Sequence, residues 1–191
     1  MSQTKIEWAD ETWSPITGCT LISEGCGNCY AYRMAKRLAG RHGYPKTQPF
    51  NVKIHRNRLT RKHSPMSMRK GKRIFVCSMG DIFHQDVKDE WLDMVFNIMY
   101  LANWHFYFIL TKRPKRMRTY LIDLSNRTNR MISELFPNVA FGIIAENQNE
   151  YNNRMPALTN ISRVITPQTF VETQMRTQQE TGLIRVQRRR Y

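Results

Sequence analysis

The sequence predicts an α/β fold built on a parallel β-sheet. Three compact apolar segments, at residues 73–77, 106–110 and 139–144, alternate with segments in which apolar residues recur at helical spacing. This alternation favours parallel strands joined by right-handed crossover connections. The chain has 191 residues, of which 41% are hydrophobic, and this is enough to bury one core.

The expected elements follow one another in a regular order. The first part holds a short strand near residues 12–16, a glycine-rich cysteine loop, and a helix that starts at Tyr30 and stops at Gly40. Residues 41–72 contain scattered prolines and arginines and predict a long loop with short helical pieces at most. The remaining elements alternate as follows: the strand at 73–77, a helix over 87–99, the strand at 106–110, a helix from Pro114, a short helix within 129–136, the strand at 139–144, a helix from Gln148 and a last strand beginning at Val164–Ile165.

Three cysteines lie within eleven residues, at Cys19, Cys26 and Cys29. Soft thiolates select zinc, copper(I) or iron–sulfur clusters. Three thiolates leave one iron of a four-iron cluster open to a cofactor or substrate, whereas a closed structural zinc site has four ligands. A zinc site with Cys77 or a histidine as fourth ligand, or a Cys-x-x-Cys redox pair, is the alternative. A disulfide framework is not expected because the first residues do not resemble a secretory signal, and Cys77 is expected to pack within its apolar strand.

Polar residues follow each of the three predicted strands. They are Ser78 and Asp81, Thr111 and Lys112, and Glu146 and Asn147. In parallel sheets, ligands bind beyond the carboxyl ends of the strands. Because the cysteine loop also follows a strand, we expect all of these residues to meet on one rim.

The charge of the chain is uneven. The net charge is +15, and no acidic residue lies between Glu24 and Asp81, an interval that holds fourteen lysines and arginines. Such a block attracts polyanions, although charge alone does not separate nucleic acid from a nucleotide-sized anion or from a merely solvated surface. The candidate nucleic-acid contacts are Arg56, Arg58, Arg61, Lys62, Arg69, Lys70, Lys72 and Arg73.

Five segments carry a family resemblance: residues 5–8, 12–19, 74–81, 109–114 and 142–147. They resemble a bacteriophage- and prophage-associated three-cysteine-motif family of uncharacterised function, over roughly residues 1–162. The order of a three-cysteine loop, then Gly-Asp, then Leu-Thr-Lys after successive strands is similar in layout to radical S-adenosylmethionine enzymes.

This resemblance implies a partial (β/α) barrel of parallel strands and two cofactors. Cys19, Cys26 and Cys29 would bind three irons of a 4Fe–4S cluster, and the fourth iron would take the amino and carboxylate groups of S-adenosylmethionine. With an electron donor, the cofactor would be cleaved to a deoxyadenosyl radical that abstracts hydrogen from a substrate. The implied cofactor-binding residues are Tyr30, Ser78, Gly80, Asp81, Lys112, Glu146 and Asn147.

Individual roles follow from the same resemblance. Gly80 would allow close backbone approach, and Asp81 would pair with the cofactor ammonium unless it caps the next helix. Lys112 would bind the cofactor carboxylate or the substrate, unless it is a solvated lysine. Glu146 and Asn147 would hydrogen-bond ribose or substrate.

The chain departs from radical enzymes in two places. Six residues separate Cys19 from Cys26 where these enzymes usually have three, and Asn28 replaces their usual aromatic residue, which leaves Tyr30 as the nearest ring. The C-terminal end looks truncated or divergent as well. We therefore predict a partial barrel with the cysteine loop over residues 1–166, incomplete at its C-terminal end, and a polar, basic, disordered tail over 167–191.

The leading hypothesis is thus an iron–sulfur, S-adenosylmethionine-dependent phage protein of unknown substrate, with nucleic acid or nucleotide as a candidate. The rivals are a zinc-stabilised, non-catalytic nucleic-acid-binding protein and an inactive truncated remnant. The longest apolar stretch, Val95 to Leu110, is too short to cross a bilayer, so we expect no membrane partner and a place in the cytoplasm of a bacterial host. The sequence does not give the oligomeric state.

Overall fold

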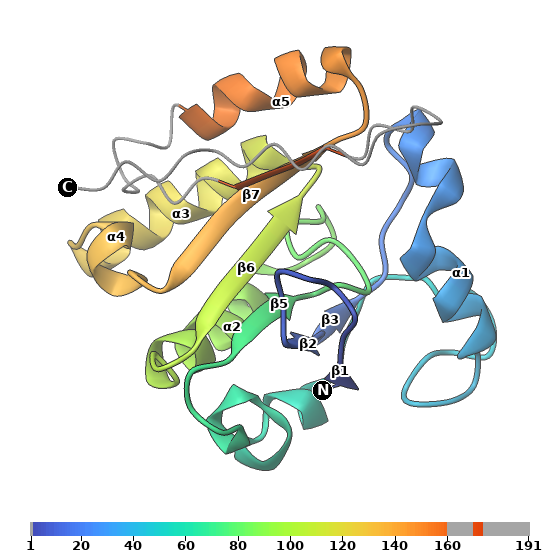
Figure 1. Cartoon of the computed structure of the whole chain (residues 1–191), viewed down its shortest axis with the longest axis horizontal. Coiled ribbons are helices and arrows are strands. Elements are labelled where there is room, and N and C mark those ends of the chain that lie inside the picture. Colours follow the sequence, from blue (N-terminus) through green and yellow to red (C-terminus); the bar gives the residue numbers. More distant parts are fainter. Residues whose placement is uncertain (1, 160–169, 174–191) are drawn as a thin grey trace.

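The computed structural model describes residues 2–159 and 170–173, which form an open, mostly parallel sheet with its helices (Figure 1). The main sheet has the strand order β1-β2-β5-β6-β7-β8. Its strands are β1 (Ser2–Gln3), β2 (Glu11–Trp13), β5 (Arg73–Val76), β6 (Phe106–Thr111), β7 (Val139–Ala145) and β8 (Phe170–Thr173). Strand β1 is antiparallel to β2, and every other neighbouring pair is parallel.

The predicted α/β fold with a parallel sheet is confirmed. The two outer strands, β1 and β8, do not pair with each other in the described part of the chain, so this part forms an open sheet and not a closed barrel. A second, two-stranded sheet joins β3 (Ile16–Thr17) to β4 (Lys53–Ile54) in antiparallel fashion. This small sheet joins the segment just before the cysteine loop to the long basic loop.

The described residues contain helices α1 (Tyr30–Arg37), α2 (Asp89–Leu101), α3 (Pro114–Thr128), α4 (Ile132–Leu135) and α5 (Gln148–Thr159). Figure 1 shows α2 and α3 behind the sheet and α5 beyond β7. Helix α1 lies apart from the main sheet, at the right of this view. The predicted loop over residues 41–72 carries only β4 and three short 3₁₀ turns, η2 (Arg56–Leu59), η3 (Arg61–His63) and η4 (Pro65–Ser67). None of the described helices has the length and apolar character needed to cross a membrane.

The core lies between the sheet and helices α2 and α3. Its largest fully buried side chains include Trp13, Tyr107, Tyr120, Phe96 and Phe141. The polar tips of these rings are satisfied, because the Trp13 indole donates to a backbone carbonyl at 3.0 Å and the Tyr107 hydroxyl does so at 3.0 Å. Burying these rings stabilises the packing of the sheet against its helices.

Some element boundaries differ from the predicted ones. The strand expected at 73–77 ends at Val76, because Cys77 turns the chain with a φ of 58°. Within the predicted tail over 167–191, Phe170–Thr173 forms β8, which pairs with β7. The rest of that tail and the strand expected at Val164–Ile165 lie outside the described residues.

Candidate functional site at the carboxyl rim

Two glycines fix where the cysteine loop starts. Gly18 and Gly80 form a parallel β-bridge beyond the end of β5. Gly18 has a φ of 93°, and a Cβ on it would lie 2.3 Å from the carbonyl oxygen of Asn51. A Cβ on Gly80 would lie 2.5 Å from the carbonyl oxygen of Gly18. Only glycine fits at either position. Gly80 was expected to allow close backbone approach, and in this structure that approach is to the backbone of Gly18.

The three cysteines are free thiols distributed along the loop. Cys19 follows Gly18, Cys26 lies in the 3₁₀ turn η1 (Glu24–Asn28), and Cys29 precedes α1. All three are partly exposed, whereas Cys77 is buried and its burial raises the pKa of the thiol to about 12. Among the residues that the structure describes, no three histidine, cysteine, aspartate or glutamate side chains are arranged to hold a metal ion.

Arg113 connects Cys19 to the end of β6. Its guanidinium donates to the Cys19 Sγ at 3.2 Å and to the Asp81 Oδ2 at 3.2 Å. It also donates to the hydroxyl and the carbonyl of Thr20, whose hydroxyl lies 2.8 Å from Nε2 of the buried His84. Burial and the charge of Asp81 raise the pKa of the Cys19 thiol, and Arg113 offsets this only in part.

Lys112 stands beside Cys26. Its Nζ lies 3.7 Å from the Cys26 Sγ and 3.2 Å from the Ser23 hydroxyl. Burial raises the pKa of the Cys26 thiol, but hydrogen bonds from the Ile22 and Ser23 backbone and from the Ser23 hydroxyl, together with the charge of Lys112, lower it by more. Cys26 therefore reaches the thiolate form more readily than Cys19 does.

Asp81 is fully engaged by the protein. Its Oδ1 accepts hydrogen bonds from the Phe83 amide and the Thr111 hydroxyl, at 3.0 and 2.7 Å. Its Oδ2 accepts from the Lys112 amide and the Arg113 guanidinium, at 3.1 and 3.2 Å. The carboxylate thus orders the turn after β5 and joins it to the end of β6. It does not cap α2, which starts farther along the chain.

Glu146 is the carboxylate on which the cysteine loop packs. A Cβ on Gly25 would lie 3.0 Å from its side chain. Arg154 donates to the Glu146 Oε2 at 2.8 Å, and the Lys112 Nζ lies 3.3 Å from Oε1. Oε1 is buried and finds no hydrogen-bond partner among the described residues. Burial raises the pKa of Glu146, but the nearby Ser23 hydroxyl, the hydrogen bond from Arg154 and the charge of Lys112 lower it to about 2.

The remaining predicted cofactor residues are Tyr30, Ser78 and Asn147. Tyr30 is 61% exposed. The Ser78 hydroxyl lies 3.3 Å from the hydroxyl of Ser14. Asn147 accepts a hydrogen bond from the Glu150 amide at 2.8 Å and so caps the start of α5. Ser78 and Asn147 therefore hydrogen-bond within the fold, and Tyr30 faces solvent.

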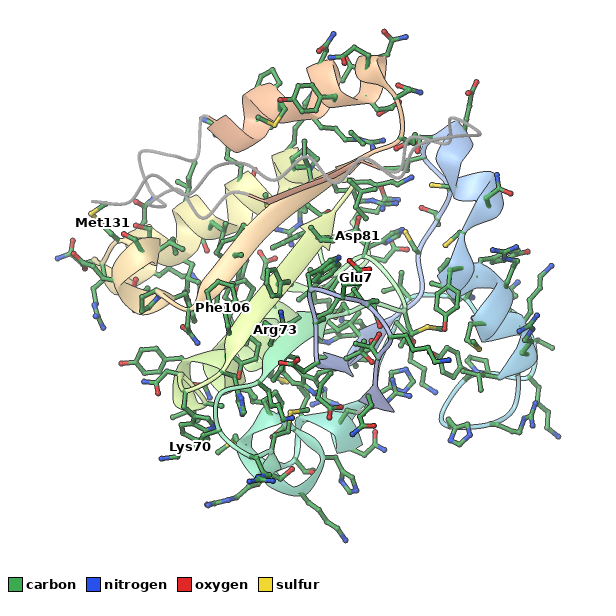
Figure 2. All side chains as sticks on the ribbon, in the orientation of Figure 1. Glu7, Lys70, Arg73, Asp81, Phe106 and Met131 are labelled. Atoms are coloured by element: carbon green, nitrogen blue, oxygen red, sulfur yellow. The ribbon has the colours of Figure 1, made fainter. Side chains whose placement is uncertain are left out.

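Of the predicted nucleic-acid contacts, Lys70 and Arg73 lie away from this rim. Figure 2 shows Lys70 at the opposite end of the sheet from Asp81, with Arg73 between them. Arg73 pairs with Asp10 at 2.9 Å, and Arg58 donates to a backbone carbonyl at 2.7 Å. Arg58 and Lys72 are half-buried, and the exposed members of the set are Arg56, Arg61, Lys62, Arg69, Lys70 and Arg73.

Sequence reasoning missed several residues of this site. Arg113 directly follows Lys112 in a segment that follows a strand, and this second cation was a usable signal. Arg154 follows Glu150 by one helical turn, and this spacing predicts an ion pair, which the structure shows at 2.6 Å. No sequence pattern indicated that Arg154 would also donate to the Ile144 carbonyl at 2.6 Å.

The fold and the site define an α/β protein in which a loop with three free cysteine thiols lies at the carboxyl rim of a parallel sheet. Residues 3–169 match the family described as "Protein of unknown function (DUF5131)", and the chain belongs to this family. Neither a curated protein nor a solved structure matches the chain. The predicted membership of a family of uncharacterised function is therefore confirmed.

Proposed function

We propose that this protein binds a 4Fe–4S cluster and S-adenosylmethionine, as a radical-type enzyme of a phage- and prophage-associated family. The observation that carries the proposal is a loop with three free thiols at the carboxyl rim of a parallel sheet, in which Cys26 and Cys19 contact Lys112 and Arg113. Ligands of such sheets bind at this rim. The partial-barrel layout, the phage association and the bacterial cytoplasm rest on the resemblance of the segments named above.

The donor set of the loop suits the cluster. Metal binding needs thiolates, and the cations of Lys112 and Arg113 favour the charged forms of Cys26 and Cys19. The three sulfurs are not gathered at one centre in the described structure. Loading therefore requires the three thiols to move closer to one another. The glycines on either side of Cys26 give the backbone the freedom to do so.

The residues of the chain would bind and orient the cofactor. When bound, the cluster and S-adenosylmethionine would supply one-electron chemistry that ends in hydrogen abstraction from a substrate, with the electron from an external donor. Glu146 is suited to accept the cofactor ammonium, because its buried Oε1 has no hydrogen-bond partner among the described residues. It takes over the role that the resemblance gave to Asp81, since both Asp81 oxygens are engaged. Lys112 would pair with the cofactor carboxylate.

Binding of S-adenosylmethionine tests this proposal. Calorimetry should show binding to anaerobically reconstituted protein and none to the metal-free chain. Glu146→Gln should weaken that binding about tenfold, the effect of one lost charge-assisted hydrogen bond. Glu150→Gln is the matched control, since it also removes a carboxylate partner of Arg154 but leaves Glu146 in place. Equal binding by metal-free protein, or an equal loss in Glu150→Gln, would exclude the proposed arrangement.

A zinc-stabilised, non-catalytic nucleic-acid-binding protein is the second candidate. The observation that favours it is the group of exposed cations in the basic loop, such as Arg61, Lys62 and Lys70. One zinc per chain after purification, with no affinity for S-adenosylmethionine, would support it. A chain that binds neither metal nor cofactor would be an inactive remnant.

A further inference from the structure

A hollow of about 400 Å³ lies where β6 passes into α3, next to the cysteine loop. This volume lies within the range of about 300–1,000 Å³ that small-molecule sites span. Among the described residues its wall contains no carboxylate side chain, and its cations are Lys112, Arg113, Lys115, Arg116 and Arg154. A concave surface lined by one sign of charge concentrates ligands of the opposite sign.

These cations are not fully neutralised. Arg113 pairs with Asp81, Arg116 with Asp89, and Lys112 with Glu146, while Arg154 pairs with Glu146 and Glu150. These five cations therefore have four carboxylates as ion-pair partners in the described part of the chain. Lys115 is exposed, and no ion pair of Lys115 is found in the described part of the chain. The hollow therefore keeps a net positive charge and one cation that is free to bind a ligand.

The start of α3 adds to this positive charge. The helix has Pro114 at its first position, no acidic residue in its first turn and no side-chain cap. The first amides of a helix have no intrahelical acceptor, and the helix dipole favours an anion there. Lys115 and Arg116 occupy this turn, although cations are unfavourable at this end of a helix. An anion bound in the hollow would neutralise Lys115 and accept hydrogen bonds from the free amides.

We infer that this hollow binds the phosphate group of a nucleotide-sized ligand. Arg154, a cation only 5% exposed, forms part of its wall, and guanidinium groups and helix-start amides both suit phosphate oxygens. The amides of Gln85 and Asn153 also line the hollow and can hydrogen-bond the remainder of the ligand. Lys112 and Arg113 contact the hollow and the cysteine sulfurs alike. A reaction on this ligand at the cysteine loop rests on the proposed function, whereas the binding itself does not.

The test compares three single charge reversals by calorimetry on the metal-free and the reconstituted full chain. Lys115→Glu lies in the hollow, Arg118→Glu lies one turn farther along α3 with an exposed side chain, and Lys62→Glu lies in the basic loop. The probes are inorganic phosphate, the four ribonucleoside monophosphates, the matching nucleosides and a single-stranded oligonucleotide. Circular dichroism checks the fold, and Asn153→Ala serves as a neutral second variant of the hollow.

We expect at least one monophosphate to bind, its nucleoside to bind at least tenfold more weakly, and inorganic phosphate to compete. Lys115→Glu should weaken binding about tenfold or more, Asn153→Ala about threefold, and Arg118→Glu and Lys62→Glu less than twofold. Tighter binding of the oligonucleotide, with the same loss in Lys115→Glu, would identify a strand as the source of the phosphate, and equal binding would identify a free nucleotide. Absence of phosphate-dependent binding, or equal losses in all three reversals, would overturn the inference. Iron content is measured separately, so a failed cluster is distinguishable from a failed phosphate site.

Discussion

At the scale of single residues, Asp81 and Glu146 are both buried carboxylates at the carboxyl rim, but their surroundings give them different uses. Asp81 accepts four hydrogen bonds, two on each oxygen, from groups of the protein. Glu146 has ion-pair partners on both oxygens but keeps one oxygen without a hydrogen bond among the described residues. The Oε1 atom of Glu146 has the Lys112 ammonium at 3.3 Å as its ion-pair partner but accepts no hydrogen bond in the described part of the chain. A ligand that donates a hydrogen bond to it would satisfy a group that is otherwise costly to bury. Asp81 instead joins the turn after β5 to the end of β6.

The low pKa of Glu146 predicts an acid-sensitive fold. Its pKa of about 2 in the folded chain lies below the ordinary value of 4.5. Its carboxylate therefore contributes stability that is fully present above pH 4.5 and is lost as the pH falls through 2. The difference between the two pKa values corresponds to about 3 kcal/mol. Denaturant unfolding between pH 7 and pH 2 should show a loss of stability that is smaller by about this amount in Glu146→Gln. The same pH dependence in both proteins would contradict this role.

At the scale of elements, the site is made by the turns that follow successive strands and by the bridge between Gly18 and Gly80. That bridge brings the cysteine loop against the end of β5, and neither glycine has room for a Cβ. The backbone therefore sets the position of Cys19 before any side chain contributes. The hydrogen bonds of Lys112 to Cys26 and of Arg113 to Cys19 then hold the loop from the end of β6.

Gly80→Ala should displace the cysteine loop. The added Cβ would meet the Gly18 carbonyl oxygen at 2.5 Å, which is backbone and cannot move aside cheaply. We expect a loss of about 1–3 kcal/mol in the free energy of unfolding, together with reduced iron loading. Gly27→Ala is the matched control in the same loop, because a Cβ there meets nothing within 4 Å. If both variants load iron as the natural chain does, the bridge does not position the cysteines.

The sequence was sufficient to predict the convergence of Asp81, Lys112 and Glu146, because each follows a strand and the carboxyl ends of parallel strands share an edge. The sequence pattern could not predict which side chains contact one another across that edge. The donation from Arg113 to Cys19 joins residues 94 positions apart and depends on the register of β5 and β6. The short strand β8 was not anticipated either, since its segment has no clear period and it gains its order from pairing with β7.

At the scale of the whole molecule, Lys70 and the cations of the hollow lie in two separate regions. Lys70 lies toward one end of the sheet (Figure 2), and the hollow at the start of α3 lies at the other, where Lys112 and Arg113 contact Cys26 and Cys19. Net charge and the count of lysines and arginines could not separate these two regions, because they are sums along the chain. The hollow at the start of α3 shares Lys112 and Arg113 with the cysteine site.

The iron and sulfide content of anaerobically reconstituted protein tests the central claim most directly. A 4Fe–4S cluster on Cys19, Cys26 and Cys29 requires about four irons and four sulfides per chain. Serine at any one of the three should abolish loading, because a hydroxyl is a poor ligand for soft iron–sulfur sites, whereas Cys77→Ser should load normally. Colourless protein with one zinc per chain, or iron that survives Cys19→Ser but not Cys77→Ser, would contradict the claim.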